Sequence, residues 1–297
     1  MNSLKILLVS LYFACALFAQ PLHQIVILGD PHLPGKRMEN KESVLHTINQ
    51  WKEVDAVVAI GDLCSQTGTH EEYAQVKEYF SKLTHPLYPI TGNHDFIYED
   101  TLDENGKLKH ASLEIQKQKR ERFQQIFGLS KLYYSIEKEP YLLIFLSADT
   151  HAYLSGISDV QALWFEEELK KYPKKPTIVF FHAPLNHTLE SYKHWVNTPS
   201  FVAQPIEKIQ SILKVHPQVF LWVSGHTHTS PLEKSFASAI NLYEQHVTNI
   251  HNSDMNKETI WTNSLLLYSD KVMVKTYNHA TQKWENALER TFIKPTF

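Results

Sequence analysis

The stretch QIVILGDPH, residues 24–32, decides the fold. It is an apolar, β-branched run that passes through a glycine into a carboxylate and an imidazole, a pattern typical of a strand ending at a polar site. Four similar stretches follow along the chain: AVVAIGD at 56–62, LYPITGNHD at 87–95, IVFFHAP at 178–184 and VFLWVSGHTH at 219–228. Each places an Asp, Asn or His just after an apolar run, so we expect these groups to meet in one place.

Helical patterns separate the first three of these strands. Residues 39–53 place Val44, Ile48 and Trp51 on one stripe, and residues 71–83 show similar spacing. A strand–helix–strand–helix–strand order predicts parallel strands joined by right-handed crossovers. Parallel strands that are apolar along their length are buried on both faces, and their carboxyl ends open onto a shared crevice. The pattern therefore predicts an α/β fold with its site at the strand carboxyl ends.

The later parts of the chain predict further elements of the same fold class. We expect helices over 112–127, 158–171 and 205–215, with Ser158 as a possible helix cap. Further strands are expected at 133–136 and 141–147, followed near the C-terminus by a hairpin of 264–267 and 271–277.

Composition sets the broad class of the protein. The chain has 297 residues, of which 43% are hydrophobic and 12% aromatic, so a folded globular protein is expected rather than a disordered one. This length allows one large α/β domain or two small ones. The net charge of −3 gives no basic footprint, so no specific nucleic-acid partner is expected.

Residues 1–19 resemble a targeting segment. Lys5 is followed by an apolar run from 6 to 18, and Ala14-Cys15-Ala16 and Ala19-Gln20 both fit a small-residue cleavage site. Three interpretations stay open: a cleaved secretory signal, a lipoprotein signal with a lipid anchor at Cys15, and an uncleaved anchor. The run is short for a membrane-spanning helix. We therefore predict residues 20–297 as a single mature domain without a transmembrane segment, exported to the periplasm or the extracellular space.

Only two cysteines are present, Cys15 and Cys64. If Cys15 leaves with the signal, no internal disulfide can form, and the exported protein must rely on its core. Cys64 follows the second motif by two residues, and we interpret it as a small buried apolar side chain.

The polar residues of the five stretches form a ligand set for one or two divalent metals. Their order, D-x-H, G-D, G-N-H-D, a lone His and G-H-x-H, resembles that of the calcineurin-like metallophosphoesterases. The resemblance covers about Ile25 to His228, and Gly156, Gln161 and Trp164 make it most similar to the bacterial phosphodiesterase-type branch. It implies a sandwich of two mixed β-sheets flanked by helices.

The resemblance also implies a cofactor of two divalent ions, manganese, iron or zinc. Carried over position by position, one metal would be held by Asp30, His32 and His228, the other by Asn93, His182 and His226, with Asp62 bridging both. Two anionic ligands against two dications leave a positive centre that suits a phosphate.

The activity that the resemblance implies is hydrolysis of a phosphate ester, either a phosphodiester or a phosphomonoester. A hydroxide bridging the metals would attack phosphorus, because a metal can lower the pKa of a bound water to about 7. His94 would donate the proton to the leaving oxygen, and Asp95 is a candidate for orienting His94. The protein would thus be a metal-dependent phosphoesterase, a hydrolase of ester bonds.

Some motif positions differ from those of related phosphoesterases, and these differences indicate which branch of the family the chain resembles. Purple acid phosphatases have a Tyr three residues after the G-D aspartate, where this chain has Ser65, and they end the third motif in Glu rather than Asp95. Many phosphodiesterase-type relatives have an Arg where this chain has Phe96. Arg120 or Arg122, from the helix expected over 112–127, is a candidate to replace it.

Two other functions stay open. The same metal centre could serve an exported nuclease or phospholipase, or the scaffold could be a non-catalytic interaction module. The interaction module is disfavoured because all seven ligands and His94 are present. The loop after the fourth motif carries His187, Tyr192 and His194. Two interpretations stay open for them, lining of the pocket and solvated loop residues, of which we favour the second.

Overall fold

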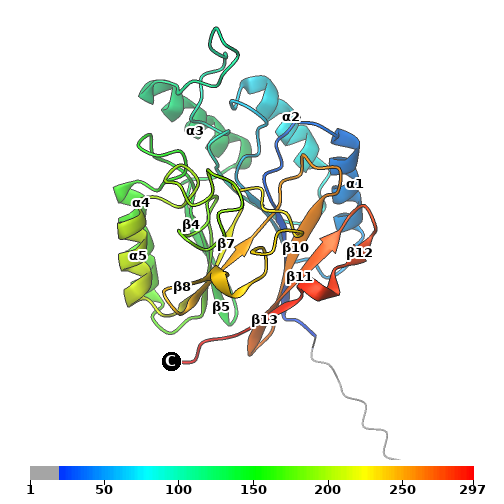
Figure 1. Ribbon diagram of the computed structural model, residues 1–297, viewed down its shortest axis with the longest axis vertical. Coiled ribbons are helices and arrows are strands. Elements are labelled where there is room, and N and C mark those ends of the chain that lie inside the picture. Colours follow the sequence, from blue (N-terminus) through cyan, green and yellow to red (C-terminus); the bar gives the residue numbers. More distant parts are fainter. Residues whose placement is uncertain (1–19) are drawn as a thin grey trace, which may run out of the picture.

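The computed structural model describes residues 20–297, so the predicted signal segment 1–19 lies outside the described residues. Two β-sheets lie face to face, with helices on their outer sides (Figure 1). The helices are α1 (Met38–Asn49), α2 (His70–Ser81), α3 (Leu113–Phe127), α4 (Asp159–Lys171) and α5 (Ile206–Val215), with two short 3₁₀ turns at Ala239–Asn241 and Asn286–Leu288. The predicted sandwich of two mixed sheets is confirmed.

The first sheet has the strand order β12-β11-β10-β1-β2-β3, and β13 also pairs with β11. Its strands are β1 (His23–Leu28), β2 (Ala56–Ile60), β3 (Leu87–Ile90), β10 (Trp261–Leu267), β11 (Lys271–Asn278), β12 (Lys283–Trp284) and β13 (Arg290–Ile293). The pairs β1–β2 and β2–β3 are parallel, as predicted from the alternating strand and helix patterns. The predicted C-terminal hairpin is the antiparallel pair β10–β11.

The second sheet has the order β4-β5-β6-β7-β9-β8. Its strands are β4 (Tyr134–Lys138), β5 (Tyr141–Phe145), β6 (Thr177–Phe180), β7 (Val219–Ser224), β8 (Leu242–Tyr243) and β9 (Val247–His251). The run β5-β6-β7-β9 is parallel. Strand β9 was not predicted, because Thr248 and Asn249 interrupt its apolar pattern; the Asn249 side-chain oxygen instead accepts the backbone N–H of Leu185.

Three apolar layers hold these elements together. The inner faces of both sheets share one core, in which Ile27 and Val58 lie with Leu143 and Ile178. A second cluster joins the outer face of the first sheet to α1, α2 and α3, and a third joins the outer face of the second sheet to α4 and α5 (Figure 1). Because β1, β2, β5, β6 and β7 are covered on both faces, their polar neighbours lie only at the strand ends.

The helix starts follow simple capping chemistry. Ser158 accepts the N–H of Gln161 at the start of α4, which confirms the predicted cap, and Thr69 forms a reciprocal capping box with Glu72 at the start of α2. Cys64 is fully buried, as predicted. Within residues 20–297, no helix combines the length and the apolar character needed to cross a membrane.

Candidate metal centre

The predicted site residues meet where the parallel strands end. Asp30 follows β1, Asp62 follows β2, Asn93 follows β3, His182 follows β6 and His226 follows β7. These are the carboxyl ends of five strands from both sheets, so the two sheets together form the floor of the site. The prediction that these five residues lie at neighbouring strand ends is confirmed.

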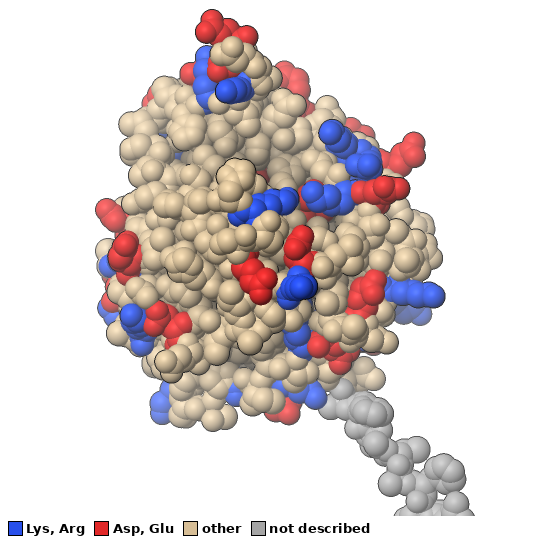
Figure 2. Space-filling view, viewed as in Figure 1, with Lys and Arg blue, Asp and Glu red and all other residues tan. Residues whose placement is uncertain are grey.

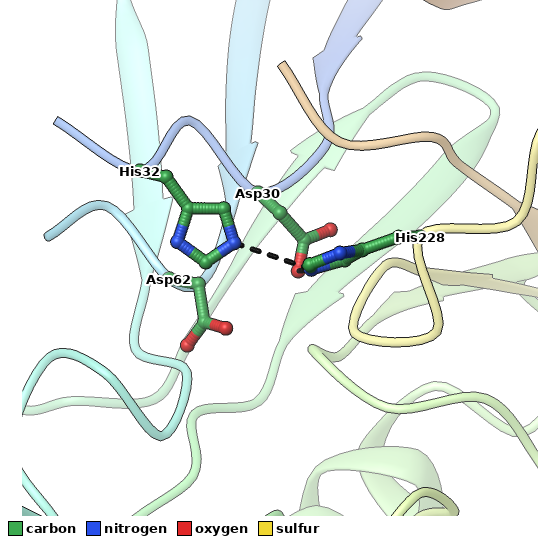
Figure 3. Close-up of side chains that lie close together, drawn as sticks. All are labelled: Asp30, His32, Asp62 and His228. Atoms are coloured by element: carbon green, nitrogen blue, oxygen red, sulfur yellow. Dashed lines mark hydrogen bonds and ion pairs between the residues drawn. The ribbon is translucent and has the colours of Figure 1, made fainter. Parts of the chain in front are cut away.

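The first group of side chains is Asp30, His32, Asp62 and His228, whose candidate ligand atoms all lie within 4.8 Å of one another. They point toward one another from separate segments of the chain (Figure 3). The Nε2 atoms of His32 and His228 are only 3.2 Å apart, and His228 Nε2 is 3.5 Å from Asp30 Oδ1. Two imidazole nitrogens and two carboxylates converging in this way fit a divalent cation between them.

The second group is Asp62, His182 and His226. His182 Nε2 lies 3.3 Å from Asp62 Oδ2 and 3.3 Å from the amide oxygen of Asn93. Asn93 therefore presents its oxygen, which is the metal-binding atom of an amide, to this group. Asp62 belongs to both groups, as a bridging carboxylate must.

Backbone carbonyls fix which imidazole nitrogen faces the site. His182 Nδ1 donates to the carbonyl of Ile60, and His226 Nε2 donates to the carbonyl of Ser200, each at 2.9 Å. A neutral imidazole that donates through one nitrogen carries its lone pair on the other. His182 Nε2 and His226 Nδ1 are thus left as lone-pair donors, and the donor set fits the metals that the sequence predicted.

The backbone is strained at most of these positions. Positive φ angles occur at Asp30 (40°), His32 (47°), Asp62 (50°), His226 (64°) and His228 (49°). Non-glycine residues adopt such angles at a cost, and they concentrate at functional sites. Five of the seven predicted ligands therefore lie on backbone in the left-handed region.

Two glycines allow the close approach of the ligand loops. A Cβ atom on Gly225 would lie 2.2 Å from Asp30 Oδ2, and one on Gly92 would lie 2.3 Å from Asp62 Oδ1. Asp30 instead accepts the backbone N–H of His226 through both carboxylate oxygens, at 2.9 and 3.1 Å. Gly92 and Gly225, which open the third and fifth motifs, are therefore required by packing against the carboxylates.

Burial and the carboxylates set the charge state of the site. Burial lowers the pKa of His32 to about 4 and that of His226 to about 3. Burial would also lower the pKa of His182, but the adjacent Asp62 raises it to about 9. Burial opposes ionisation of Asp62 as well, yet His182 holds its pKa well below the usual value. A cation binds ionised carboxylates and neutral imidazoles, so His182 would release its proton when a cation binds.

His94 lies at the edge of the two groups. Its backbone N–H donates to Asp62 Oδ1 at 2.9 Å, and its ring centroid is 5.2 Å from that of His32. Its Nδ1 donates to the carbonyl of Gln66 at 2.6 Å. The sequence suggested Asp95 as the residue that orients His94, and this was wrong.

Asp95 has a different role in the structure. Its carboxylate is buried and accepts the backbone N–H groups of Cys64 and Gly92, at 2.9 and 2.7 Å. It thereby ties the loop after β2 to the loop after β3. Burial and the charge of Asp62 raise the pKa of Asp95 to about 7.

Arg120 and Arg122 are the candidates for the role of the arginine that relatives carry where this chain has Phe96, and both contact other groups of the protein. Arg122 donates to the carbonyl of Gly68 at 2.7 Å. The Arg120 guanidinium lies 5.1 Å above the ring of Phe96, which is itself fully buried. Arg122 therefore holds the backbone in place, whereas Arg120 packs directly on the residue that occupies the expected arginine position.

Sequence reasoning missed several residues that contact the ligands. The Asn93 side-chain NH₂ group donates to the hydroxyl of Tyr98 at 3.2 Å, which directs the amide oxygen toward the site. The ring of Phe201 stacks on His226 with centroids 5.0 Å apart. Tyr192, interpreted from the sequence as a loop residue that is either solvated or lining the pocket, is half-buried, and its hydroxyl donates to the carbonyl of Thr227 at 3.3 Å. Tyr98 lies five residues after Asn93, and this nearness was the one signal available.

The sequence is similar to that of known phosphoesterases. The sequence model described as calcineurin-like phosphoesterase matches residues 23–230. The chain is 29% identical over 223 residues to a probable glycerophosphodiester phosphodiesterase of Arcobacter nitrofigilis, a match covering 69% of this chain and 71% of the relative. It is 26% identical over 178 residues to a 3',5'-cyclic-nucleotide phosphodiesterase of a Nostoc species, covering 59% of this chain and 56% of that relative.

Solved structures share the fold at low sequence identity. A dimetal phosphatase from Danio rerio superposes with a TM-score of 0.65 at 13% identity, covering 93% of this chain and 100% of that chain. A purple acid phosphatase from yellow lupin seeds gives a TM-score of 0.62 at 16% identity, covering 91% of this chain and 53% of that chain. Because the family match spans more than half of the sequence and includes all eight predicted site residues, this chain belongs to the calcineurin-like phosphoesterase family and is a metal-dependent hydrolase of phosphate esters.

Proposed function

We propose that this chain is a phosphodiesterase that holds two divalent cations at the strand ends. One cation would be bound by Asp30, His32 and His228, and the other by Asn93, His182 and His226, with Asp62 between them. The observation that carries the proposal is the double membership of Asp62, which lies within ligand distance of both groups. Carboxylate, amide and imidazole donors suit Mn²⁺, Fe²⁺ or Zn²⁺.

The protein's own groups have distinct parts in the reaction. Two bound cations would activate a water and neutralise the charge that develops on the phosphoryl oxygens. The Asp62 carboxylate offsets part of the repulsion between two cations. The backbone of the ligand loops is held in its strained form by bonds such as those from His226 N–H to Asp30. A site fixed in this way need not reorganise when the substrate arrives.

His94 is the proposed proton donor to the leaving oxygen. With Nδ1 donating to the Gln66 carbonyl, Nε2 is the nitrogen that can hold and deliver a proton. The residue is only partly buried, whereas the adjacent Asn93 is buried. His94 can therefore meet a substrate that approaches from solvent while Asn93 stays turned to the metals.

A diester is favoured over a monoester by the charge at the site. A monoester dianion carries one more charge than a diester and gains from an additional cationic side chain. Among the described basic side chains around the site, Arg122 donates to the Gly68 carbonyl, Lys41 donates to the His32 carbonyl and Lys257 pairs with Asp254, so each of these three cations already has a partner. The names of the two curated relatives, both phosphodiesterases, point the same way.

The test is hydrolysis of bis(4-nitrophenyl) phosphate beside 4-nitrophenyl phosphate. We expect the diester to be cleaved faster, a chelator to abolish activity on both, and Mn²⁺ to restore it. A preference for the monoester would contradict the diester assignment. Two cations bound with neither ester cleaved would favour the non-catalytic interaction module over an enzyme.

The alternative of a nuclease or phospholipase can be examined in the same assay. Acidic and basic side chains are interspersed on the face shown in Figure 2, and the net charge is −3. A protein that binds long nucleic acids by its phosphates needs a continuous basic surface. We therefore expect single-stranded DNA, RNA and phospholipid vesicles to be cleaved more slowly than a small diester.

We also propose that the mature protein is exported as a single domain of residues 20–297. The support is the apolar segment after Lys5 and a core that takes residues from Ile25 to Val274. The mass of the protein recovered from its producing cell should correspond to cleavage near Ala16 or Ala19. Incorporation of labelled palmitate at Cys15 would instead establish the lipid anchor, and recovery of the uncleaved chain from the cytoplasm would contradict export.

A further inference from the structure

A carboxylate outside the family match lies beside the metal centre. Asp254 follows strand β9 and is 1% exposed, whereas the match ends at residue 230. Its Oδ2 atom lies 3.5 Å from Nδ1 of His228 and 3.1 Å from Nζ of Lys257, but makes no well-aligned hydrogen bond. Its Oδ1 atom accepts the backbone N–H of Asn256 at 2.8 Å.

The segment that carries Asp254 is anchored to two ligand loops. The backbone N–H of Met255 donates to the Asp30 carbonyl at 3.2 Å. The buried Lys41 ammonium group donates to the His32 carbonyl and to Asn256 Oδ1, each at 2.7 Å. The position of the Asp254 carboxylate is therefore fixed relative to the same loops that carry the first group of ligands.

The two nitrogens of His228 face different partners. Nε2 points to Asp30 Oδ1 and to His32 Nε2, which is where a cation would lie, and Nδ1 points to Asp254. For Nε2 to offer a lone pair, the ring proton must reside on Nδ1. A carboxylate that accepts this proton selects the metal-binding tautomer and fixes the ring orientation.

We propose that Asp254 is a positioning residue for His228, and that it holds the imidazole in the tautomer and orientation that bind the cation. The proposal rests on the metal ligands assigned under the proposed function. It gives the C-terminal segment after β9 a part in the metal centre, although that segment carries none of the family's motifs.

Two structural roles of Asp254 must be separated from this one. The carboxylate could serve only to pair with Lys257, whose side chain is 47% exposed, or only to accept the N–H of Asn256. Lys257→Ala removes the first role and leaves His228 untouched. Asp254→Asn keeps an oxygen for the N–H of Asn256, but its NH₂ group then faces His228 Nδ1. That NH₂ group and a protonated His228 Nδ1 would both be donors, so the imidazole would favour the tautomer with its proton on Nε2. In that tautomer Nε2 has no lone pair for a metal.

The experiment measures Zn²⁺ affinity by competition with a chelator, for the wild-type chain, Asp254→Asn and Lys257→Ala. We expect Asp254→Asn to weaken one of two bound equivalents by about 10- to 100-fold, and Lys257→Ala to change neither equivalent by more than about twofold, as for an exposed ion pair. Thermal unfolding of the metal-free proteins is measured alongside, and we expect similar midpoints for all three.

Each contrary result has a distinct meaning. Wild-type affinity in Asp254→Asn, or an equal loss in Lys257→Ala, overturns the role of Asp254 and leaves the proposed function standing. Failure of the wild-type chain to bind Zn²⁺ overturns both proposals. If Asp254→Asn does not fold, the ring ¹⁵N signals of His228 in the Zn²⁺-loaded wild-type protein decide: metal on Nε2 with a proton on Nδ1 supports the proposal, and metal on Nδ1 overturns it.

Discussion

The Nδ1 atom of His94 lies 2.6 Å from the carbonyl oxygen of Gln66, in the loop between β2 and α2. A main-chain carbonyl can only accept, so this contact fixes the orientation of the ring and leaves Nε2 toward the substrate side. The residue proposed as proton donor is thus oriented by the loop that follows the bridging Asp62. The same loop carries Thr67, whose carbonyl accepts from the buried Lys119.

Replacing His94 with Ala should leave metal content unchanged and lower turnover. For an alkyl diester, whose leaving oxygen needs a proton, we expect a loss in kcat of about 10²- to 10⁴-fold. For a 4-nitrophenyl diester the loss should be much smaller, because nitrophenolate leaves without a proton. His46→Ala, on the exposed side of α1, is the matched control. Equal losses of kcat on the two substrates would show that His94 does not donate the proton to the leaving oxygen.

Replacing Asp62 with Asn should affect both cations at once. The bridging carboxylate lies in both ligand groups, and its charge offsets the repulsion between the ions. Elemental analysis after dialysis should give about two equivalents of metal per wild-type chain. It should give less than about one for Asp62→Asn, because both cations lose a ligand at once. His228→Ala, which removes a ligand of one group alone, should keep one equivalent. Retention of two equivalents in Asp62→Asn would show that this carboxylate does not bridge.

Replacing Asp95 with Asn should lower stability. Its two carboxylate oxygens accept the buried N–H groups of Cys64 and Gly92, and an amide offers only one oxygen, so one buried donor loses its partner. We expect a decrease of about 1–3 kcal/mol in the free energy of unfolding, measured with denaturant on metal-free protein at pH 4. At that pH the Asp95 carboxyl, with its pKa of about 7, is neutral in the folded protein, so the replacement removes no charge there.

Asp103→Asn is a close control for that change. Asp103 also accepts two backbone N–H groups, from Asn105 and Lys107, but both bonds end on Oδ1, so an amide keeps the acceptor. Its replacement should change stability by less than about 0.5 kcal/mol. If the two variants lost equal stability, the loss of the second acceptor oxygen at Asp95 would not be the cause.

Acid should destabilise the metal-free protein in part through His279. Burial lowers its pKa to about 4, while its unfolded value is near 6.5, so protons bind the unfolded chain preferentially between these values. The contribution to stability is complete above pH 6.5 and is lost as the pH falls toward 4. The loss from this group should be about 3 kcal/mol between pH 8 and pH 4.

His279→Gln provides the measurement of this effect. Denaturant unfolding at pH 8 and pH 4 should show a smaller decrease for the variant than for the wild-type chain. His32, His226 and His251, whose pKa values burial lowers to about 4, 3 and 3, remain in both proteins and contribute to the residual slope. Identical decreases in the two proteins would show that His279 does not contribute.

The end of helix α1 differs from the end that the sequence pattern predicts. The apolar stripe of the first helix predicted residues 39–53, but α1 ends at Asn49. Trp51, which fits the helical spacing, instead packs after the helix end against Tyr277 and Trp284, with centroids 5.1 and 5.3 Å away. The partners of Trp51 come from the far end of the chain, and local periodicity contains no information about them.

The sequence alone predicted that the site residues meet. Apolar runs that are buried on both faces are typical of parallel central strands, and the carboxyl ends of such strands share an edge, so the polar residue after each run is brought to one place. Asp30, Asp62, Asn93, His182 and His226 each follow such a run. The paired His226 and His228 followed from their spacing of two residues.

The groups that orient these ligands are set by contacts that form only in the folded protein. Gln66, Ser200 and Ile60 act through backbone carbonyls, which every residue possesses, so the sequence does not single them out. Asp254 acts on His228 from the segment after the unpredicted strand β9, and nothing in the sequence distinguishes it from other aspartates. The ligands themselves are a matter of residue type, whereas their tautomers and strained backbone depend on contacts between distant segments.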